Sequence, residues 1–165
     1  MVSTEISTSS ECLQRSCLIR VATESDLEKL GVMGHLFAEL YGQNLMRFDT
    51  VIFLAKMREF LSLGSGTVLC AHLDQDLKGA LAGVRYENVF DGEPCASELF
   101  WYVWPGAPKG TGRLLLREFE AWAIGAGCTR VTMAYMLHNS GTLPAFYERN
   151  GYTAFETQYV KDLDA

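Results

Sequence analysis

A glycine-rich stretch in the middle of the chain has the residue types of a phosphate-binding turn. It reads Lys109-Gly110-Thr111-Gly112-Arg113, so that two glycines stand between two cations. An amphipathic helical pattern follows it, and the unpaired N–H groups at a helix start attract anions. A simple tight turn between a strand and a helix is the alternative, and it explains one glycine better than two.

Two common nucleotide-binding patterns do not fit this stretch. A Walker A loop aligned on Gly112 would put its first glycine at Ala107, and an Arg-Leu pair follows Gly112 where Lys-Ser/Thr is required. A dinucleotide fingerprint starting at Gly110 would need a third glycine at Leu115. The sequence therefore excludes both patterns.

Glu98 is a candidate general base because it directly precedes a buried aromatic run. Strand alternation would place it on one face with Phe100 and Tyr102. Burial there would raise the pKa of the carboxyl group toward neutrality, which suits a base. A solvated glutamate at a strand start is an equal alternative. His138 is the competing base, although a strand-end histidine facing water is the simpler interpretation.

The elements that position these residues form a strand–helix–strand unit. An apolar strand from Cys95 to Trp104 stops at a Pro-Gly-Ala-Pro sequence. The following helix has apolar residues at helical spacing and ends at Ala126-Gly127. A further strand runs from Thr129 to Leu137, which implies a parallel pair with a right-handed crossover.

The remaining elements are read from turn, cap and periodicity signals. Ser25 and Glu28 have the spacing of a capping box, Asp49 or Thr50 can cap a second helix, and Gly79 and Gly83 mark a bulge. The expected elements are a strand at 17–21, helices at 25–40 and 50–63, strands at 67–73 and 77–90, a short helix at 142–150 and a last strand at 152–163.

Composition indicates one ordered domain. The 165 residues are 48% hydrophobic, so we expect a single domain at 17–165 after a flexible tail at 1–16. A net charge of -6 argues against a nucleic-acid partner. The charge mildly favours a cationic amine substrate, but solubility alone explains it better.

Cellular location is also inferred from composition. Five cysteines without a CxxC pair indicate a reducing compartment and no metal site. No signal peptide or membrane-spanning run is evident, so the expected location is cytoplasmic, without a membrane partner.

Two segments resemble the GCN5-related N-acetyltransferase (GNAT) family. Val103-Trp104-Pro105 followed by 107–112 resembles its motif A, Arg/Gln-x-x-Gly-x-Gly/Ala, with Ala107 in place of the usual Arg or Gln and a preceding loop about one residue short. Asn139 and Phe146-Tyr147-Glu148-Arg149-Asn-Gly-Tyr152 resemble its motif B, although the asparagine lies one residue further from the tyrosine than is common. The resemblance covers nearly the whole of 17–163.

The resemblance implies an α/β fold with a mixed, mostly antiparallel sheet, a splayed central parallel strand pair and helices on both faces. It implies an N-acetyltransferase that moves an acetyl group from acetyl-CoA to a primary amine, on a small molecule or a protein, by direct attack in a ternary complex. Homodimers are common in the family. Because Ala107 departs from the motif, a CoA-sensing or protein-binding module with this fold is the alternative.

The resemblance also assigns roles to individual residues. Tyr147 corresponds to the tyrosine that protonates the leaving thiolate, and Glu98 to the strand glutamate that some members use as a base. The remaining expected contacts are with the donor: the pantetheine arm would lie along the backbone of Tyr102 and Val103, and the rest of CoA would contact Ala107, Lys109, Gly110, Thr111, Gly112, Arg113 and Asn139.

Overall fold

The computed structural model describes residues 16–42, 46–136 and 141–163. Its centre is a five-stranded mixed sheet whose strands lie side by side in chain order. The strands are β1 (Leu18–Val21), β2 (Gly66–Leu73), β3 (Asp76–Glu87), β4 (Pro94–Val103) and β5 (Arg130–Thr132). Neighbours are antiparallel except for β4 and β5, which are parallel. The expected mixed, mostly antiparallel sheet with one parallel pair is confirmed.

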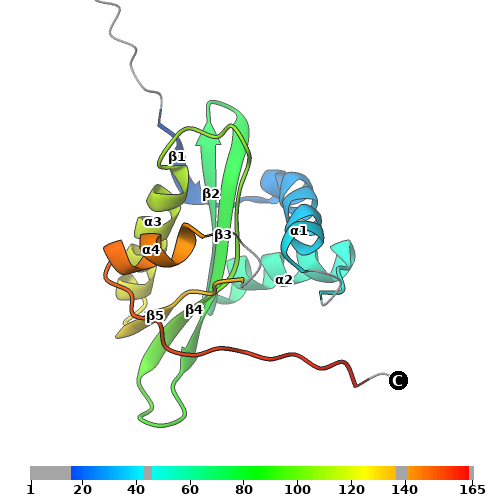
Figure 1. The fold of residues 1–165 in the computed structure, drawn as a ribbon. Helices are drawn as coiled ribbons and strands as arrows, with labels where there is room; N and C mark the ends of the chain where they lie inside the picture. The colour runs from blue at the N-terminus through cyan, green and yellow to red at the C-terminus, as the bar shows by residue number, and fades with distance from the viewer. Residues whose placement is uncertain (1–15, 43–45, 137–140, 164–165) are drawn as a thin grey trace, which may run out of the picture.

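Helices cover both faces of this sheet (Figure 1). A short 3₁₀ turn at Glu24–Asp26 leads into α1 (Leu27–Tyr41), and α2 (Thr50–Leu63) follows; both lie on one side. The other side holds α3 (Thr111–Gly125), which connects β4 to β5, and α4 (Leu143–Arg149). The crossover from β4 through α3 to β5 is the unit that the sequence predicts.

The core has two layers because the central strands are buried on both faces. Along β2, Val68 and Cys70 belong to the cluster under α1 and α2, whereas Leu69 and Ala71 belong to the cluster under α3. Such strands read as nearly continuous apolar runs. The α3 layer is centred on Phe119, which is fully buried.

The backbone of β3 approaches Phe119 of α3 closely at Gly83. A Cβ atom added there would lie 2.5 Å from Phe119 Cζ and 2.7 Å from the Ser97 carbonyl oxygen. The β3–β4 register also shifts between Ala82 and Gly83, as expected for a bulge at this glycine. Glycine is therefore required here for packing.

Gly83→Ala is accordingly expected to destabilise the fold by about 1–3 kcal/mol, because either Phe119 or the β4 backbone must move. The measurement is the urea midpoint at unchanged m-value. Gly125→Ala is the control, since its Cβ would meet nothing within 4 Å and it sits in helical backbone. Equal stability of the Gly83 variant and the wild type would contradict this packing argument.

The helix starts differ in part from the predictions. Asp49 caps α2 by accepting a hydrogen bond from the Ile52 N–H at 3.0 Å, so the first of the two expected caps is used. The predicted capping box of Ser25 and Glu28 is wrong: the box lies two residues earlier, where the Asp26 carboxylate accepts from the Thr23 N–H at 2.7 Å. Asp26 is selected because it also binds Arg20 of β1.

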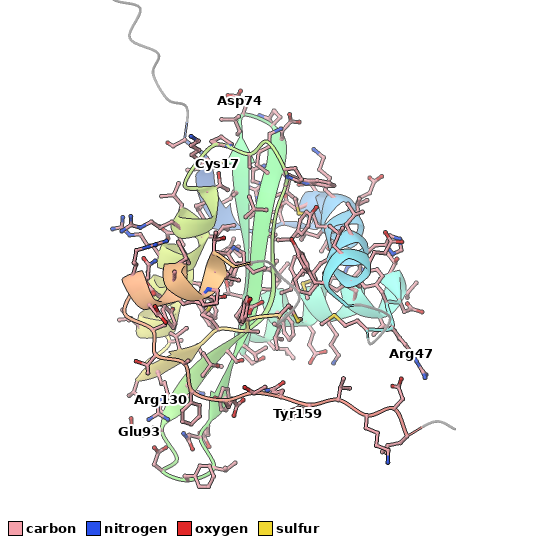
Figure 2. The ribbon with its side chains drawn as sticks, in the orientation of Figure 1. Cys17, Arg47, Asp74, Glu93, Arg130 and Tyr159 are labelled. Atoms are coloured by element: carbon pink, nitrogen blue, oxygen red, sulfur yellow. The ribbon has the colours of Figure 1, made fainter. Side chains whose placement is uncertain are left out.

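The end of the chain is the largest departure from the predicted elements. The strand expected at 129–137 is paired only over Arg130–Thr132, and the strand expected at 152–163 is wrong. Residues 153–163 are extended and exposed, and Figure 2 shows Tyr159 on this segment. An apolar alternating pattern forms a strand only where a neighbouring strand has free backbone groups, and β5 is too short to offer a full edge.

Candidate active site

The site lies where the parallel strands β4 and β5 separate. The ladder joins Cys95, Ala96 and Ser97 to 130–132 and then stops. One residue further along β4, the register against β3 shifts, so that Glu98 pairs with Gly83 and Phe100 with Ala82. Leu99 is the extra residue at this irregularity. The strands therefore leave a gap beside the second half of β4.

The irregularity also changes which face the β4 side chains occupy. Ala96 packs in the α3 layer, whereas Phe100 and Tyr102 pack under α1 and α2. Simple alternation would put all three on one face. The prediction that Glu98 shares the face of Phe100 and Tyr102 assumed unbroken alternation of side chains along the strand, and β4 does not alternate regularly across Leu99.

Glu98 turns its carboxylate into the gap. Its Oε2 accepts a hydrogen bond from the Ala134 N–H at 3.1 Å, and the residue is only 8% exposed. Burial raises the pKa of the Glu98 carboxyl group to about 7, against the opposing effect of the Ala134 hydrogen bond. Near neutral pH this buried carboxyl group can therefore take up or release a proton.

Tyr147 reaches the same gap from α4. Pro144 lies in the first turn of this helix, where proline is tolerated, and the Tyr147 ring packs against Trp101 and Tyr152. The hydroxyl donates a hydrogen bond to the Ala134 carbonyl at 2.9 Å. Burial, followed by the negative charge of Glu98, raises the pKa of Tyr147 well above its usual value. The phenol is therefore a proton donor at neutral pH.

Ala134 joins the two side chains, and sequence reasoning missed it. Its N–H binds Glu98 and its carbonyl binds Tyr147. Ala134 acts through its backbone, so its residue type gives no indication of this role. The only indication in the sequence was the predicted strand that pairs in parallel with β4, because Ala134 lies in it.

A pocket of about 210 Å³ opens at these residues. Apart from Glu98, its lining is aromatic or aliphatic and comes from α1, β4, α4 and the segment after β5. The lining residues are Phe37, Tyr41, Glu98, Leu99, Trp101, Tyr102, Val103, Ala134, Met136, Leu143 and Tyr147. Phe37 and Tyr41 of α1 therefore face this pocket, whereas Tyr86 and Phe90 lie outside its lining and are exposed.

The glycine-rich turn begins α3 at the adjacent end of β4. Gly110 has a φ of +91°, which L side chains rarely adopt, and the Thr111 hydroxyl donates to the Pro108 carbonyl at 2.7 Å. The Leu114 N–H bonds Gly110, so the N–H groups of Gly112 and Arg113 belong to the first turn, which a helix does not satisfy internally. This turn has the geometry of an anion site.

The turn and the pocket are neighbours. A Cβ at Gly112 would lie 3.2 Å from Trp101 and 3.8 Å from Val103, both of which line the pocket. Lys109 and Arg113 are exposed beside it. Ala107 differs, because its N–H is already bonded to the Trp104 carbonyl at 3.1 Å. The structure thus brings together the predicted residues of β4, α3 and α4, while Asn139 and His138 lie outside the described residues.

A separate buried cluster contains Asp26, Cys70 and His72, whose ligand atoms lie within 4.8 Å of one another. The Asp26 carboxylate already accepts two hydrogen bonds from the Arg20 guanidinium and others from Thr23. A guanidinium in this position opposes a metal cation. We interpret the cluster as the anchor that joins β1, β2 and the start of α1.

The cysteines at 17, 70, 95 and 128 carry free thiols. Across the described ranges, none of the helices combines the length and the apolar character needed to cross a bilayer.

Solved structures with similar folds include acetyltransferases and a transcriptional regulator. A transcriptional regulator from Bacillus halodurans C-125 has a TM-score of 0.75 at 21% identity, covering 89% of this chain and 99% of that one. AAC(6')-Iy, in complex with the bisubstrate analogue CoA-S-monomethyl-acetylneamine, has a TM-score of 0.72 at 16% identity, covering 90% and 99%.

A third similar structure is the aminoglycoside antibiotic 6'-N-acetyltransferase AAC(6')-IG from Acinetobacter haemolyticus, with a TM-score of 0.66 at 22% identity and coverage of 89% and 99%. No curated protein sequence matches the chain significantly. The family model for the acetyltransferase (GNAT) family matches residues 35–152, most of the chain. The chain therefore belongs to the GNAT family of acetyltransferases.

Proposed function

We propose that this protein transfers the acetyl group of acetyl-CoA to a primary amine by direct attack in a ternary complex. The observation that carries the proposal is the meeting of Glu98, with a pKa near 7, and a protonated Tyr147 at Ala134, in the gap beside an anion-binding helix start. One group can accept a proton and the other can donate one, as the two halves of aminolysis require.

The donor would lie along β4 with its diphosphate at the start of α3. First-turn N–H groups of Gly112 and Arg113, the glycine at 110 and the cations of Lys109 and Arg113 suit a diphosphate. The Thr111 hydroxyl stabilises the turn through its hydrogen bond to the Pro108 carbonyl. Ala107 would contribute packing alone, because its N–H is occupied. The pantetheine arm would follow the free edge of β4 past Tyr102 and Val103.

Val103 is suitably placed to stabilise the developing oxyanion. The next residue, Trp104, donates its N–H to the Lys78 carbonyl of β3 at 2.9 Å. Backbone N–H groups alternate sides along a strand, so the Val103 N–H points away from β3 and toward the gap. A fixed N–H donor in a low-dielectric gap is the type of group that stabilises a tetrahedral oxyanion.

The proposed reaction balances with these groups. Glu98 takes one proton from the neutral attacking amine as the nitrogen bonds to the thioester carbonyl carbon, while Val103 binds the oxygen. The C–S bond then breaks, Tyr147 protonates the departing thiolate, and exchange of protons with solvent returns Glu98 to its ionised form and Tyr147 to its protonated form. The products are an N-acetyl amide and CoA, without an acyl-cysteine intermediate.

The cytoplasm is the compartment in which we place this activity.

The first test is a thermal-shift titration with acetyl-CoA, with dephospho-CoA and ATP as controls. A saturable rise in melting temperature with acetyl-CoA, together with little change with ATP, would support the donor site. No shift at millimolar acetyl-CoA would overturn the enzyme proposal and favour a protein-binding module with this fold.

The proposed diphosphate site at the start of α3 predicts that nearby cations raise the affinity for acetyl-CoA. Lys109→Ala and Arg113→Ala are each expected to raise the Kd for acetyl-CoA about 3- to 10-fold, with the larger effect at low ionic strength. Arg117→Ala is the matched control, because Arg117 is exposed on the same helix one turn further on. Isothermal titration calorimetry at two salt concentrations measures all three. Equal effects of Arg113 and Arg117 would argue against a diphosphate at this helix start.

A further inference from the structure

We infer that the acceptor is a primary amine carried on a small apolar, preferably aromatic, body without a second charged group. This inference rests on the proposed acetyl transfer and narrows its substrate class. It follows from the lining of the pocket at Glu98, which combines one acid with a wall of apolar and aromatic side chains.

The wall on the α1 side is a fixed aromatic surface. The Phe37 ring lies 5.3 Å from the Tyr41 ring and 5.3 Å, edge to face, from the ring of Phe100. Phe53 supports Phe100 from α2 at 5.5 Å, also edge to face. Rings packed in this way offer a preformed surface to an apolar ligand at little cost in side-chain entropy.

The opposite wall is also apolar, and the space is small. Leu143 and Tyr147 of α4 and Met136 after β5 complete the lining. The volume of about 210 Å³ is below the range of about 300–1,000 Å³ that is common for ligand pockets, and the acetyl end of the donor at Tyr102 and Val103 would occupy part of it. A compact body such as a phenyl ring on a short alkyl chain suits this space better than an oligosaccharide or a long polyamine.

Charge restricts the class further. Among the described lining residues, Glu98 is the only carboxylic acid. A second ammonium group would therefore be desolvated against apolar side chains without a partner, and a carboxylate on the substrate would meet Glu98. Both additions are expected to reduce turnover.

The experiment compares three acceptors that share a primary amine. They are 2-phenylethylamine, phenylalanine, which adds a carboxylate to that skeleton, and spermidine, which adds cations. The measured quantity is kcat/KM from CoA release, with N-acetylated product checked by mass spectrometry, and acetyl-CoA binding is followed separately by thermal shift. We expect 2-phenylethylamine to exceed each of the others at least tenfold.

A pair of variants tests the charge argument directly. Tyr41 lines the pocket near the end of α1, so Tyr41→Glu adds a second acid there. Tyr41→Gln is the matched control, because Gln has nearly the same size as Glu and no charge. The ratio of kcat/KM for spermidine to that for 2-phenylethylamine should be about tenfold higher in the Glu variant than in the Gln variant. A ratio that is equal in the two variants would overturn the single-acid argument.

The outcomes separate this inference from the proposed function. Faster transfer to spermidine or phenylalanine than to 2-phenylethylamine overturns the inference and leaves acetyl transfer established. Acetyl-CoA binding without transfer to any of the three amines also overturns it. Absence of acetyl-CoA binding overturns the proposed function together with it.

Discussion

Replacing Glu98 by Gln is expected to lower kcat/KM for acetyl transfer about 10²- to 10⁴-fold, the range typical for loss of a general base. Gln has nearly the same shape, and its side-chain oxygen can still accept from the Ala134 N–H, so the change removes the proton acceptor with little disturbance of packing. The measurement is kcat/KM at saturating acetyl-CoA. Glu118→Gln is the control, because Glu118 is exposed on α3.

The role of Glu98 as a base also predicts the direction in which the rate changes with pH. Glu98 acts as a base only when it is ionised, so the rate of the wild type should rise with pH through about 7, the pKa of this carboxyl group, and level off above it. The Gln variant should lose this rise. A Gln variant that retains full activity, or the wild-type profile, would show that another group takes the proton.

The same pKa shift links activity to stability. The pKa of Glu98 is raised from 4.5 to about 7 in the folded protein, so between these values the folded state binds more protons than the unfolded state. The free energy of unfolding is therefore unaffected by Glu98 ionisation below pH 4.5 and falls as the pH rises to about 7. At 1.36 kcal/mol per pKa unit, the loss is at most about 3 kcal/mol. Glu98→Gln should therefore unfold with a flatter dependence on pH than the wild type.

Tyr147→Phe is expected to lower kcat about 100-fold, which lies within the range for loss of a general acid. The affinity for acetyl-CoA should change little, because the proposed diphosphate seat at α3 is untouched. The variant also loses the hydrogen bond to the Ala134 carbonyl, which would lower the free energy of unfolding by about 1 kcal/mol. Pre-steady-state measurement of CoA release separates chemistry from donor binding.

Tyr152→Phe is the matched control for Tyr147→Phe. Its ring contacts the ring of Tyr147, and its hydroxyl donates to Glu120 of α3 at 2.9 Å, so it too loses one hydrogen bond that holds the C-terminal end of α4 in place. The two variants should have similar stability, with the kcat loss confined to Tyr147→Phe. Equal losses of kcat would mean that Tyr147 acts through positioning.

The sequence allowed the β4–α3–β5 unit to be predicted because its signals are local, whereas the helix layers on both faces of the sheet followed from the family resemblance. A continuous apolar run, two prolines, two glycines and a helical stripe through Leu115 and Phe119 each specify their own element. The roles of Glu98 and Tyr147 at one site followed from the family resemblance, because the 48 residues between them carry no geometric information about how the two side chains meet.

The features that were not predicted depend on tertiary partners. The capping box moved to Thr23 and Asp26 because Arg20 of β1 binds the same carboxylate. The strand expected at 152–163 failed because pairing requires a neighbour as well as an apolar pattern. The irregularity at Leu99, which separates the faces of Ala96 and Phe100, occurs opposite Gly83, where β3 approaches Phe119 of α3.

The most direct test of acetyl transfer by this site is a reaction with acetyl-CoA labelled with ¹³C in the acetyl group and 2-phenylethylamine, analysed by mass spectrometry. The account predicts one labelled amide for each CoA thiol released, at a rate that falls about 100-fold in Tyr147→Phe. Release of the thiol without a labelled amide, or bound acetyl-CoA that yields neither product, would contradict it.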